Sequence, residues 1–96
     1  MSKKLLLEAI HSSGLFRNVR SSQIFLLGLN YCTKCAELKM VFEELNIPYR
    51  FIDADVNVGF ADDIEEITGH EFYPMVLVYD GKDAEIITED FEKLLN

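Results

Sequence analysis

Residues 24–45 read IFLLGLNYCTKCAELKMVFEEL, and this stretch decides the fold. Its first four residues are all apolar, which predicts a buried strand. Further along, apolar side chains recur at helical spacing and predict a helix with one buried stripe, made of Leu38, Val41, Phe42 and Leu45. Between these two elements stand the chain's two cysteines, Cys32 and Cys35. A Cys-x-x-Cys pair between a strand and a helix is the arrangement of a dithiol redox site.

Length and composition predict one small globular domain. The chain has 96 residues, so we expect a single domain over 1–96. Hydrophobic residues make up 49% of the sequence, a proportion typical of folded proteins and not of disordered ones. Two cysteines are too few for a disulfide scaffold.

The N-terminal sequence carries a short apolar run, MSKKLLLE, that is interrupted by Glu8 and then by His11. This run is shorter than the roughly 7–15 residues that the core of a signal peptide needs. No other segment approaches the length of a membrane span. We therefore expect a cytoplasmic protein, whose cysteine pair cycles between dithiol and disulfide instead of forming a fixed cross-link.

The charge balance is acidic, with 17 Asp and Glu against 9 Lys and Arg and a formal net charge of −8. Such a surface repels nucleic acid phosphates and anionic lipid head groups, so we expect neither nucleic acid nor membrane as a partner. Two interpretations of the acids remain open. They favour a protein partner with a basic patch, or they keep a small monomeric domain soluble.

Apolar spacing and turn residues predict four strands and four helices. The strands span 23–29, 49–53, 75–79 and 84–87, and the helices span 3–12, 32–46, 60–68 and a final segment from Thr88 onward. An Asp80-Gly81 turn joins the last two strands. This order predicts one sheet with helices on both faces, in which the first two strands are parallel and the last two are antiparallel.

The residues at the helix ends give further expectations. Ser2 is the expected cap of the first helix, whose inward residues we predict to be Leu5, Leu6, Ala9 and Ile10. Gly69 is the expected stop of the third helix. Thr88 would cap the final helix, with Glu89 and Asp90 in its first turn, where negative charge suits the helix dipole.

The cysteine spacing suits a dithiol catalyst because the two sulfurs would have different environments. Cys32 would lie at the N-terminus of a helix, where unpaired N–H groups and the helix dipole favour a thiolate. Cys35, one turn further in, would be more buried and would act as the resolving thiol. Lys34 lies between them. It would add positive charge near Cys32, or it is simply a solvated helix residue.

Metal binding and inert cysteines are the alternatives to redox chemistry. A structural zinc site needs four ligands, and one Cys-x-x-Cys supplies two. His11 and His70 are the other soft ligands, and their spacing matches no familiar zinc finger. We therefore predict no metal and interpret the pair as redox-active, while inert cysteines remain an open alternative.

Pro74 stands directly before the predicted strand 75–79, where a residue without an N–H is tolerated. In the expected sheet, the end of strand 23–29 and the start of strand 75–79 both approach the cysteines. A cis Tyr73-Pro74 bond would turn the Tyr73 backbone toward Cys32 and leave its N–H and C=O free for a thiol substrate. An X-Pro bond in general is cis in only about 5–6% of cases.

From about Gln23 to Leu95 the chain resembles glutaredoxins, which are members of the thioredoxin fold. The resemblance depends on Tyr31-Cys32-Thr33-Lys34-Cys35, on Tyr73-Pro74, and on Tyr79-Asp80-Gly81-Lys82 in the hairpin. It implies a thioredoxin-like α/β fold with strand order 2-1-3-4, to which this chain adds an N-terminal helix. It also implies reversible thiol–disulfide exchange with Cys32 as the nucleophile, a cis bond before Pro74, and glutathione as co-substrate.

The chain departs from the family pattern at two places. Glutaredoxins usually carry Cys-Pro-Tyr-Cys, often after a lysine, whereas this chain has Thr33-Lys34 inside the motif and Leu29-Asn30-Tyr31 before it. Glutaredoxins also have Gly-Gly where the backbone approaches glutathione, and here the corresponding run is Ile86-Ile87. Two β-branched residues restrict both backbone and access at this point. Thr88 and Glu89 would still meet the γ-glutamyl end of glutathione.

Together these observations predict a glutaredoxin-like oxidoreductase. Cys32 and Cys35 would be catalytic, and the substrate would bind at Tyr31, Lys34, Tyr73, Pro74, Thr88 and Glu89. Substrates would be protein disulfides or glutathionylated proteins, the reductant glutathione or a thioredoxin-type reductase, and no cofactor would stay bound. One alternative is an electron donor to ribonucleotide reductase that thioredoxin reductase reduces.

Two further alternatives come from other classes of protein. The first is a non-catalytic thioredoxin-fold binding module that would hold a partner with Tyr31, Tyr73 and the acidic face. The second is metal or cluster binding, including glutathione-bridged iron–sulfur dimers.

Overall fold

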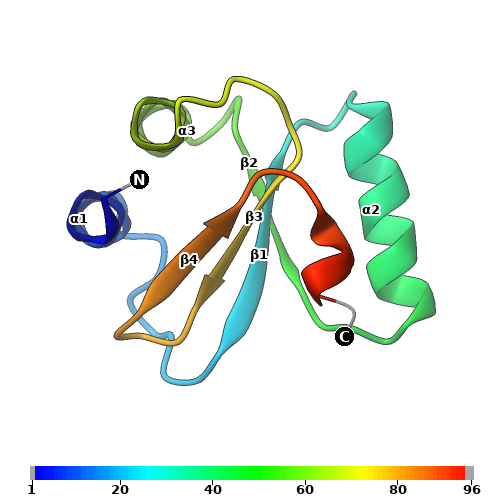
Figure 1. The fold of residues 1–96 in the computed structure, drawn as a ribbon, viewed down its shortest axis with the longest axis horizontal. Coiled ribbons are helices and arrows are strands. Elements are labelled where there is room, and N and C mark those ends of the chain that lie inside the picture. Colours follow the sequence, from blue (N-terminus) through cyan, green and yellow to red (C-terminus); the bar gives the residue numbers. More distant parts are fainter. Residues whose placement is uncertain (1, 95–96) are drawn as a thin grey trace.

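The computed structural model describes residues 2–94, except for the side chain of Lys93. The α-helices are α1 (Lys3–Ser13), α2 (Thr33–Glu44) and α3 (Val58–Thr68); the strands are β1 (Gln23–Gly28), β2 (Arg50–Asp53), β3 (Met75–Tyr79) and β4 (Ala84–Ile87); and a short 3-10 helix, η1, covers Phe91–Leu94. The four strands form one sheet in the order β2-β1-β3-β4, which confirms the thioredoxin-like order that the resemblance implies (Figure 1).

The sheet is mixed and has helices on both faces, as the element order predicts. β1 pairs with β2 in parallel, and β3 pairs antiparallel with both β1 and β4. Helices α1 and α3 lie together on one face, whereas α2 and η1 lie on the other (Figure 1). No helix within residues 2–94 has the length and apolar composition that crossing a membrane requires.

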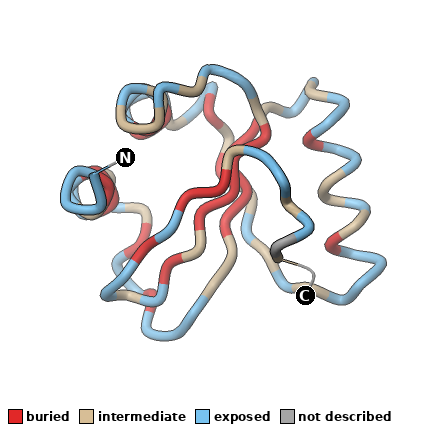
Figure 2. The backbone as a smooth tube through the Cα atoms, in the orientation of Figure 1, coloured by how far each residue is buried: buried red, intermediate tan, exposed pale blue. Residues whose placement is uncertain are grey.

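The central strand β1 is buried on both faces because helices cover both. Phe25 and Leu27 pack into the core beneath α1 and α3, while Leu26 between them packs into the core beneath α2. Side chains alternate across a strand, so a continuous apolar run fills two cores at once. Figure 2 shows the buried residues concentrated along the strands. The apolar residues 24–27 therefore place the motif that follows them at the end of a rigid strand.

The helix ends agree with most of the sequence signals. Ser2 Oγ accepts a hydrogen bond from the Leu5 N–H at 3.3 Å, which confirms it as the cap of α1. Gly69 ends α3 with φ of 67°, a left-handed conformation that glycine adopts at low cost. The chain also begins α3 two residues before the predicted start, at Val58, and Phe60 in its first turn is buried.

Two predicted core residues are exposed instead. Leu5 is 50% exposed because α1 packs mainly against α3 and β4 and buries a narrow stripe of Leu6, Ala9 and Ile10. Leu45 is 53% exposed because α2 ends at Glu44 and not at the predicted residue 46. The Ile47 N–H donates to the Phe42 carbonyl at 2.8 Å and closes the helix, so Leu45 turns away from the core.

The prediction of a final α-helix capped by Thr88 is wrong for the described residues. Thr88 and Glu89 lie outside any helix, and Asp90 has φ of 60°. A residue in this left-handed region interrupts a right-handed helix, so the helical segment begins only at Phe91 and has four residues. Phe91 packs against the core beneath α2. Residues 95–96, over which the expected helix would continue, lie outside the described part of the chain.

Substitutions of Phe42 in α2 and of Leu45 directly after it test this packing. Phe42 is fully buried, and its ring centroid lies 5.4 Å from that of Tyr49. Phe42→Ala should lower the free energy of unfolding by about 3–5 kcal/mol, because it removes a buried ring and leaves a cavity. The control Leu45→Ala should change it by less than about 0.5 kcal/mol. Urea denaturation of both variants is the measurement, and equal losses would contradict the packing described above.

Candidate active site

Cys32 occupies the N-cap position of α2, directly after the loop that leaves β1. Its φ and ψ of −89° and 118° are extended, so Cys32 precedes the helix. The predicted range 32–46 makes Cys32 the first helical residue, whereas the helix begins at Thr33. Its Sγ accepts a hydrogen bond from the Cys35 N–H at 3.2 Å, in the way that a capping oxygen would. An N–H group of the first helical turn stabilises negative charge on the atom it faces. Cys32 itself is partly exposed.

Cys35 has the opposite environment, although it lies only one turn further along. Its side chain is fully buried in the core beneath α2. This burial, together with the hydrogen bond to Cys32, raises the pKa of the Cys35 thiol to about 11. Neither cysteine is in a disulfide in this structure. The site therefore pairs an accessible sulfur with a buried thiol that stays protonated at neutral pH.

Gly28, the last residue of β1, lets α2 approach the sheet at this point. A Cβ added to Gly28 would lie 2.7 Å from the Cys35 Sγ and 3.2 Å from a Leu26 methyl carbon. Real Cβ atoms do not approach other atoms this closely. Glycine at the end of β1 is therefore what allows Cys35 to pack beneath Cys32.

The Tyr73 backbone reaches Cys32 from the other side. The Tyr73-Pro74 peptide bond is cis, as the resemblance implies, and Pro74 is buried directly before β3. Antiparallel pairing sets Leu27 of β1 opposite Met75 of β3, which brings the start of β3 to the end of β1. The Tyr73 carbonyl oxygen then lies 3.8 Å from the Cys32 Sγ, whose S–H donates to it.

Two tyrosines flank Cys32, and each has a carboxylate beside it. The Tyr73 hydroxyl donates to Glu65 Oε1 at 2.8 Å, and burial followed by this bond raises the pKa of the Tyr73 phenol. Tyr31 is 75% exposed, and Asp55, as hydrogen-bond partner and negative charge, raises the pKa of its phenol. Both phenols therefore stay protonated at neutral pH, each with a carboxylate as the partner of its hydroxyl.

The structure gathers only some of the predicted site residues. Tyr31, Cys32, Cys35, Tyr73 and Pro74 lie together at the ends of β1 and β3. Their roles in catalysis and binding remain predictions.

Three other predicted site residues are placed differently. Lys34 is exposed on the first turn of α2, and within the described residues it makes no hydrogen bond or ion pair. Thr88 and Glu89 follow the end of β4, where no α-helix begins to present its N–H groups to a ligand.

Ile86 and Ile87, at the place of the glycines in the family, are both buried, on opposite faces of β4. Ile86 packs into the core beneath α1 and α3, and Ile87 packs into the core beneath α2. Both belong to the pairing of β4 with β3. The side chains are thus part of the two cores and do not project into solvent beside Cys32.

Sequence reasoning missed three residues of the site: Gly28, Asp55 and Glu65. A glycine at the end of an apolar strand is a recognisable signal of close approach, so the sequence does offer a signal for Gly28. The bond of Glu65 to Tyr73 depends on how α3 packs on the sheet. No local pattern reports that contact.

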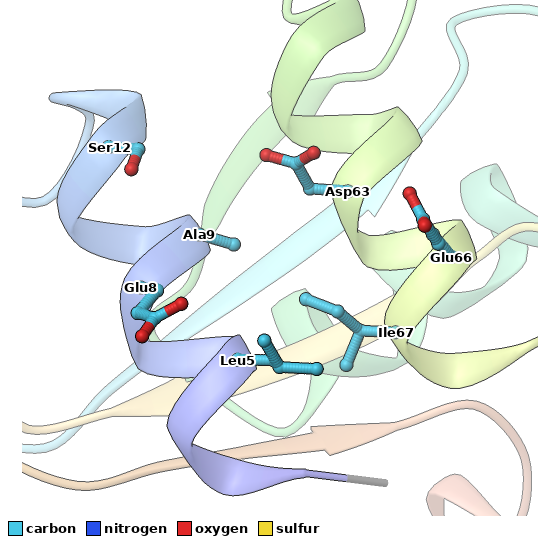
Figure 3. Close-up of a pocket in the computed structure, with 7 residues that line it drawn as sticks. All are labelled: Leu5, Glu8, Ala9, Ser12, Asp63, Glu66 and Ile67. Carbon is cyan, nitrogen blue, oxygen red and sulfur yellow. The ribbon is translucent and has the colours of Figure 1, made fainter.

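Metal ligands and the cavity shown in Figure 3 do not add to this site. Within residues 2–94, no three side chains of His, Cys, Asp or Glu are gathered as metal ligands. A cavity of about 440 Å³ lies between α1 and α3, where Glu8, Asp63 and Glu66 surround Leu5 and Ile67 (Figure 3). Neither cysteine lines it, so the chemistry of the pair does not involve this cavity.

A sheet of order 2-1-3-4 that carries a Cys-x-x-Cys pair at the start of α2, facing a cis-proline, defines a dithiol protein of the thioredoxin fold. A model of the glutaredoxin family matches residues 23–83, which is more than half of the chain. The chain therefore belongs to the glutaredoxin family. No curated protein matches the sequence significantly.

Solved structures of plant glutaredoxins share the fold. Wheat glutaredoxin superimposes with a TM-score of 0.59 at 22% identity, over 83% of this chain and 70% of that one. The holo form of glutaredoxin C1 from Populus tremula x tremuloides gives 0.57 at 18%, over 77% and 68%. A buckwheat glutaredoxin–glutathione complex gives 0.57 at 19%, over 88% and 76%. Family membership and the geometry of the pair support a glutaredoxin-like redox function.

Gly28→Ala tests the close approach of Cys35 to β1. The added methyl group would displace the Cys35 sulfur, so we expect a loss of about 1–3 kcal/mol in the free energy of unfolding. Gly59→Ala is the matched control, because a Cβ there meets no atom within 4 Å. It lies in α3, where alanine is the better helix former, so stability should be unchanged or slightly higher. Urea denaturation compares the two, and an equally stable Gly28→Ala variant would refute the contact.

The burial of Cys35 predicts a pH dependence of stability. An unfolded cysteine has a pKa of about 8.5, whereas the pKa of folded Cys35 is raised to about 11. At pH values below the pKa of the unfolded chain, the Cys35 thiol is protonated in both the folded and the unfolded state, so it adds no pH dependence to stability. As pH rises from about 8.5 toward 11, the unfolded chain loses its proton first, so stability should fall.

Urea unfolding of the reduced protein across this pH range measures the effect. Cys35→Ala is the control. Subtracting its profile removes the contributions of Tyr31 and Tyr73, whose pKa values are also raised. A difference that stays constant from neutral pH to about pH 10.5 would show that the Cys35 thiol titrates normally.

Proposed function

We propose that this protein is a thiol–disulfide oxidoreductase that reduces protein disulfides or glutathionylated proteins in the cytoplasm. One observation carries the proposal: the partly exposed Cys32 sulfur caps α2, while the buried, protonated Cys35 lies directly behind it. A reaction that needs one attacking sulfur and one reserve thiol requires this asymmetry. An inert cysteine pair would not require different environments for its two sulfurs.

In the first step the Cys32 thiol releases its proton to solvent, and the resulting thiolate attacks one sulfur of a substrate disulfide. A bond forms between Cys32 Sγ and that sulfur, the substrate S–S bond breaks, and the other substrate sulfur leaves with the electron pair and then takes a proton. The Cys35 N–H, which faces Cys32 Sγ at 3.2 Å, stabilises the negative charge before attack. The Tyr73 backbone beside Cys32 is placed to hold an extended substrate chain.

In the second step Cys35 resolves the mixed disulfide. Its thiol loses a proton and attacks Cys32 Sγ, a Cys32–Cys35 disulfide forms, and the second substrate sulfur leaves as a thiol. The pair has then given two electrons and two protons to the substrate. Because the Cys35 thiol has a pKa of about 11, its proton must be removed as attack occurs, which keeps Cys35 from competing with Cys32 for substrate. The cycle needs no bound cofactor, since both electrons pass through sulfur.

A reductant must then open the Cys32–Cys35 disulfide. One candidate is glutathione, since one of the similar structures is a glutaredoxin–glutathione complex. The second candidate is a flavoprotein of the thioredoxin reductase type, as for an electron donor to ribonucleotide reductase. Buried Ile86 and Ile87, together with the absence of an α-helix beginning at Thr88 in the described structure, favour this second reductant.

Two cysteine variants test the assignment of roles. Cys32→Ser should lower the rate of disulfide reduction by at least about a hundredfold, because it removes the attacking sulfur. Cys35→Ser should lose the reduction of protein disulfides but keep glutathione-dependent reduction of a glutathionylated peptide, in which a second glutathione replaces Cys35. Both assays are run with glutathione plus glutathione reductase and again with thioredoxin reductase.

The two variants are each other's control, since each changes one sulfur to oxygen. Full activity of Cys32→Ser would show that the roles are assigned wrongly. Absence of any disulfide exchange by the wild-type protein with either reductant would favour the non-catalytic binding module instead.

A further inference from the structure

Carboxylates of β2, of the loop after it and of α3 lie beside residues that adjoin or contact Cys32. Asp53 ends β2, and its Oδ2 accepts a hydrogen bond from Asn30 Nδ2 at 2.8 Å, two residues before Cys32. Asp55 lies beside the hydroxyl of Tyr31, the residue next to Cys32. On α3, Glu65 holds the hydroxyl of Tyr73, whose carbonyl faces Cys32. Three carboxylates thus contact residues that precede Cys32 in the chain or face it across the site.

These charges are not neutralised inside the protein. Asp62, exposed on α3, adds a fourth carboxylate that acts on Tyr73. Within the described residues the ion pair formed is Lys3 with Asp83, so none of the four carboxylates has a salt-bridge partner. Lys34 is the basic residue closest to Cys32 in the sequence, and it is exposed on α2. Charges within about 8–10 Å of one another remain coupled at physiological ionic strength.

Two exposed aromatic residues adjoin Cys32 and Tyr73 in the chain. Tyr31 directly precedes Cys32, and Phe72 directly precedes Tyr73; they are 75% and 73% exposed. Phe72 contacts the His70 ring edge-on at 5.9 Å and is otherwise open to solvent. Exposed aromatic faces bind the side chains of lysine and arginine through cation–π contacts. Rings and carboxylates together form a surface suited to cationic side chains.

We propose, on the basis of the function proposed above, that the preferred substrate is a disulfide within a lysine- or arginine-rich segment of a protein. Asp53, Asp55, Asp62 and Glu65 attract such a segment to Cys32, and Tyr31 and Phe72 contact its cationic side chains. The same carboxylates repel anionic disulfides, of which glutathione disulfide is the simplest. The site selects its substrate by charge before any sulfur reacts.

Attraction of this kind acts mainly on the rate of encounter. Clefts lined by charge of one sign raise the association rate of an oppositely charged partner by about 10–1000-fold, and salt abolishes the effect. A specificity that originates in these carboxylates must therefore fall as ionic strength rises. A specificity that comes from apolar contacts would not.

Single-turnover oxidation of the prereduced protein isolates this step, because it needs no reductant. Three disulfide peptides share one core and carry lysine, glutamine or glutamate at the flanking positions, and glutathione disulfide is the fourth oxidant. The second-order rate constants are divided by those of dithiothreitol with the same oxidants, which removes the intrinsic reactivity of each disulfide. Salt concentrations of about 0.01 M and about 1 M set Debye lengths of about 30 Å and 3 Å.

Two double variants with the same change in net charge accompany the wild type. Asp55→Asn with Asp62→Asn removes two exposed carboxylates beside the tyrosines and spares Asp53 and Glu65, whose hydrogen bonds support the site. Glu43→Gln with Glu44→Gln removes two carboxylates from the far end of α2. That helix has 12 residues, so this end is about 18 Å from Cys32.

We expect the lysine peptide to react at least about tenfold faster than the glutamate peptide at low salt. The ratio should approach one at high salt and should fall in the Asp55/Asp62 variant but not in the Glu43/Glu44 variant. Equal rates for all peptides, or equal effects of the two variants, would overturn this inference and leave the proposed function intact. No reaction with any oxidant would overturn both.

Discussion

The contact between Gly28 and Cys35 is the constraint on which the rest of the site depends. The helix after the motif can lie close to β1 only because the strand ends in a residue without a side chain. That close approach buries Cys35 and raises its pKa, and it leaves Cys32 at the N-cap, where the Cys35 N–H faces its sulfur. The absence of a side chain on Gly28 therefore gives the pair one partly exposed and one buried thiol.

Strand pairing places Tyr73, the residue that faces Cys32, at the site. β3 pairs antiparallel with β1, so Tyr73, 41 positions after Cys32, lies beside the motif, with its carbonyl oxygen 3.8 Å from the Cys32 sulfur. The tyrosine side chain extends the other way and is held by Glu65 on α3. Strand pairing therefore positions the Tyr73 backbone beside Cys32, and the packing of α3 on the sheet positions the Tyr73 side chain.

The surroundings of Cys32 differ from the glutathione pocket that the family resemblance predicts. Isoleucines fill both cores where that pocket needs bare backbone, and in the described structure no α-helix begins at Thr88. Among the described residues, the carboxylates beside Tyr31 and Tyr73 have no salt-bridge partner, and the rings of Tyr31 and Phe72 are exposed. The proposed preference for cationic protein substrates follows from these features, while the sulfur chemistry stays the same.

The amino-acid sequence by itself determined the redox motif, the bounds of β3 and β4, the caps at Ser2 and Gly69, and the helices on both faces. Each of these depends on neighbours along the chain: apolar periodicity, a capping oxygen or a flexible glycine.

Tertiary structure alone decided the exposure of Leu5, the raised pKa of Cys35 and the bond between Tyr73 and Glu65. These depend on distances between segments far apart in the chain. Local periodicity carries no information about such distances, because the strength of desolvation and of a hydrogen bond is set by what packs against a residue and not by what precedes it.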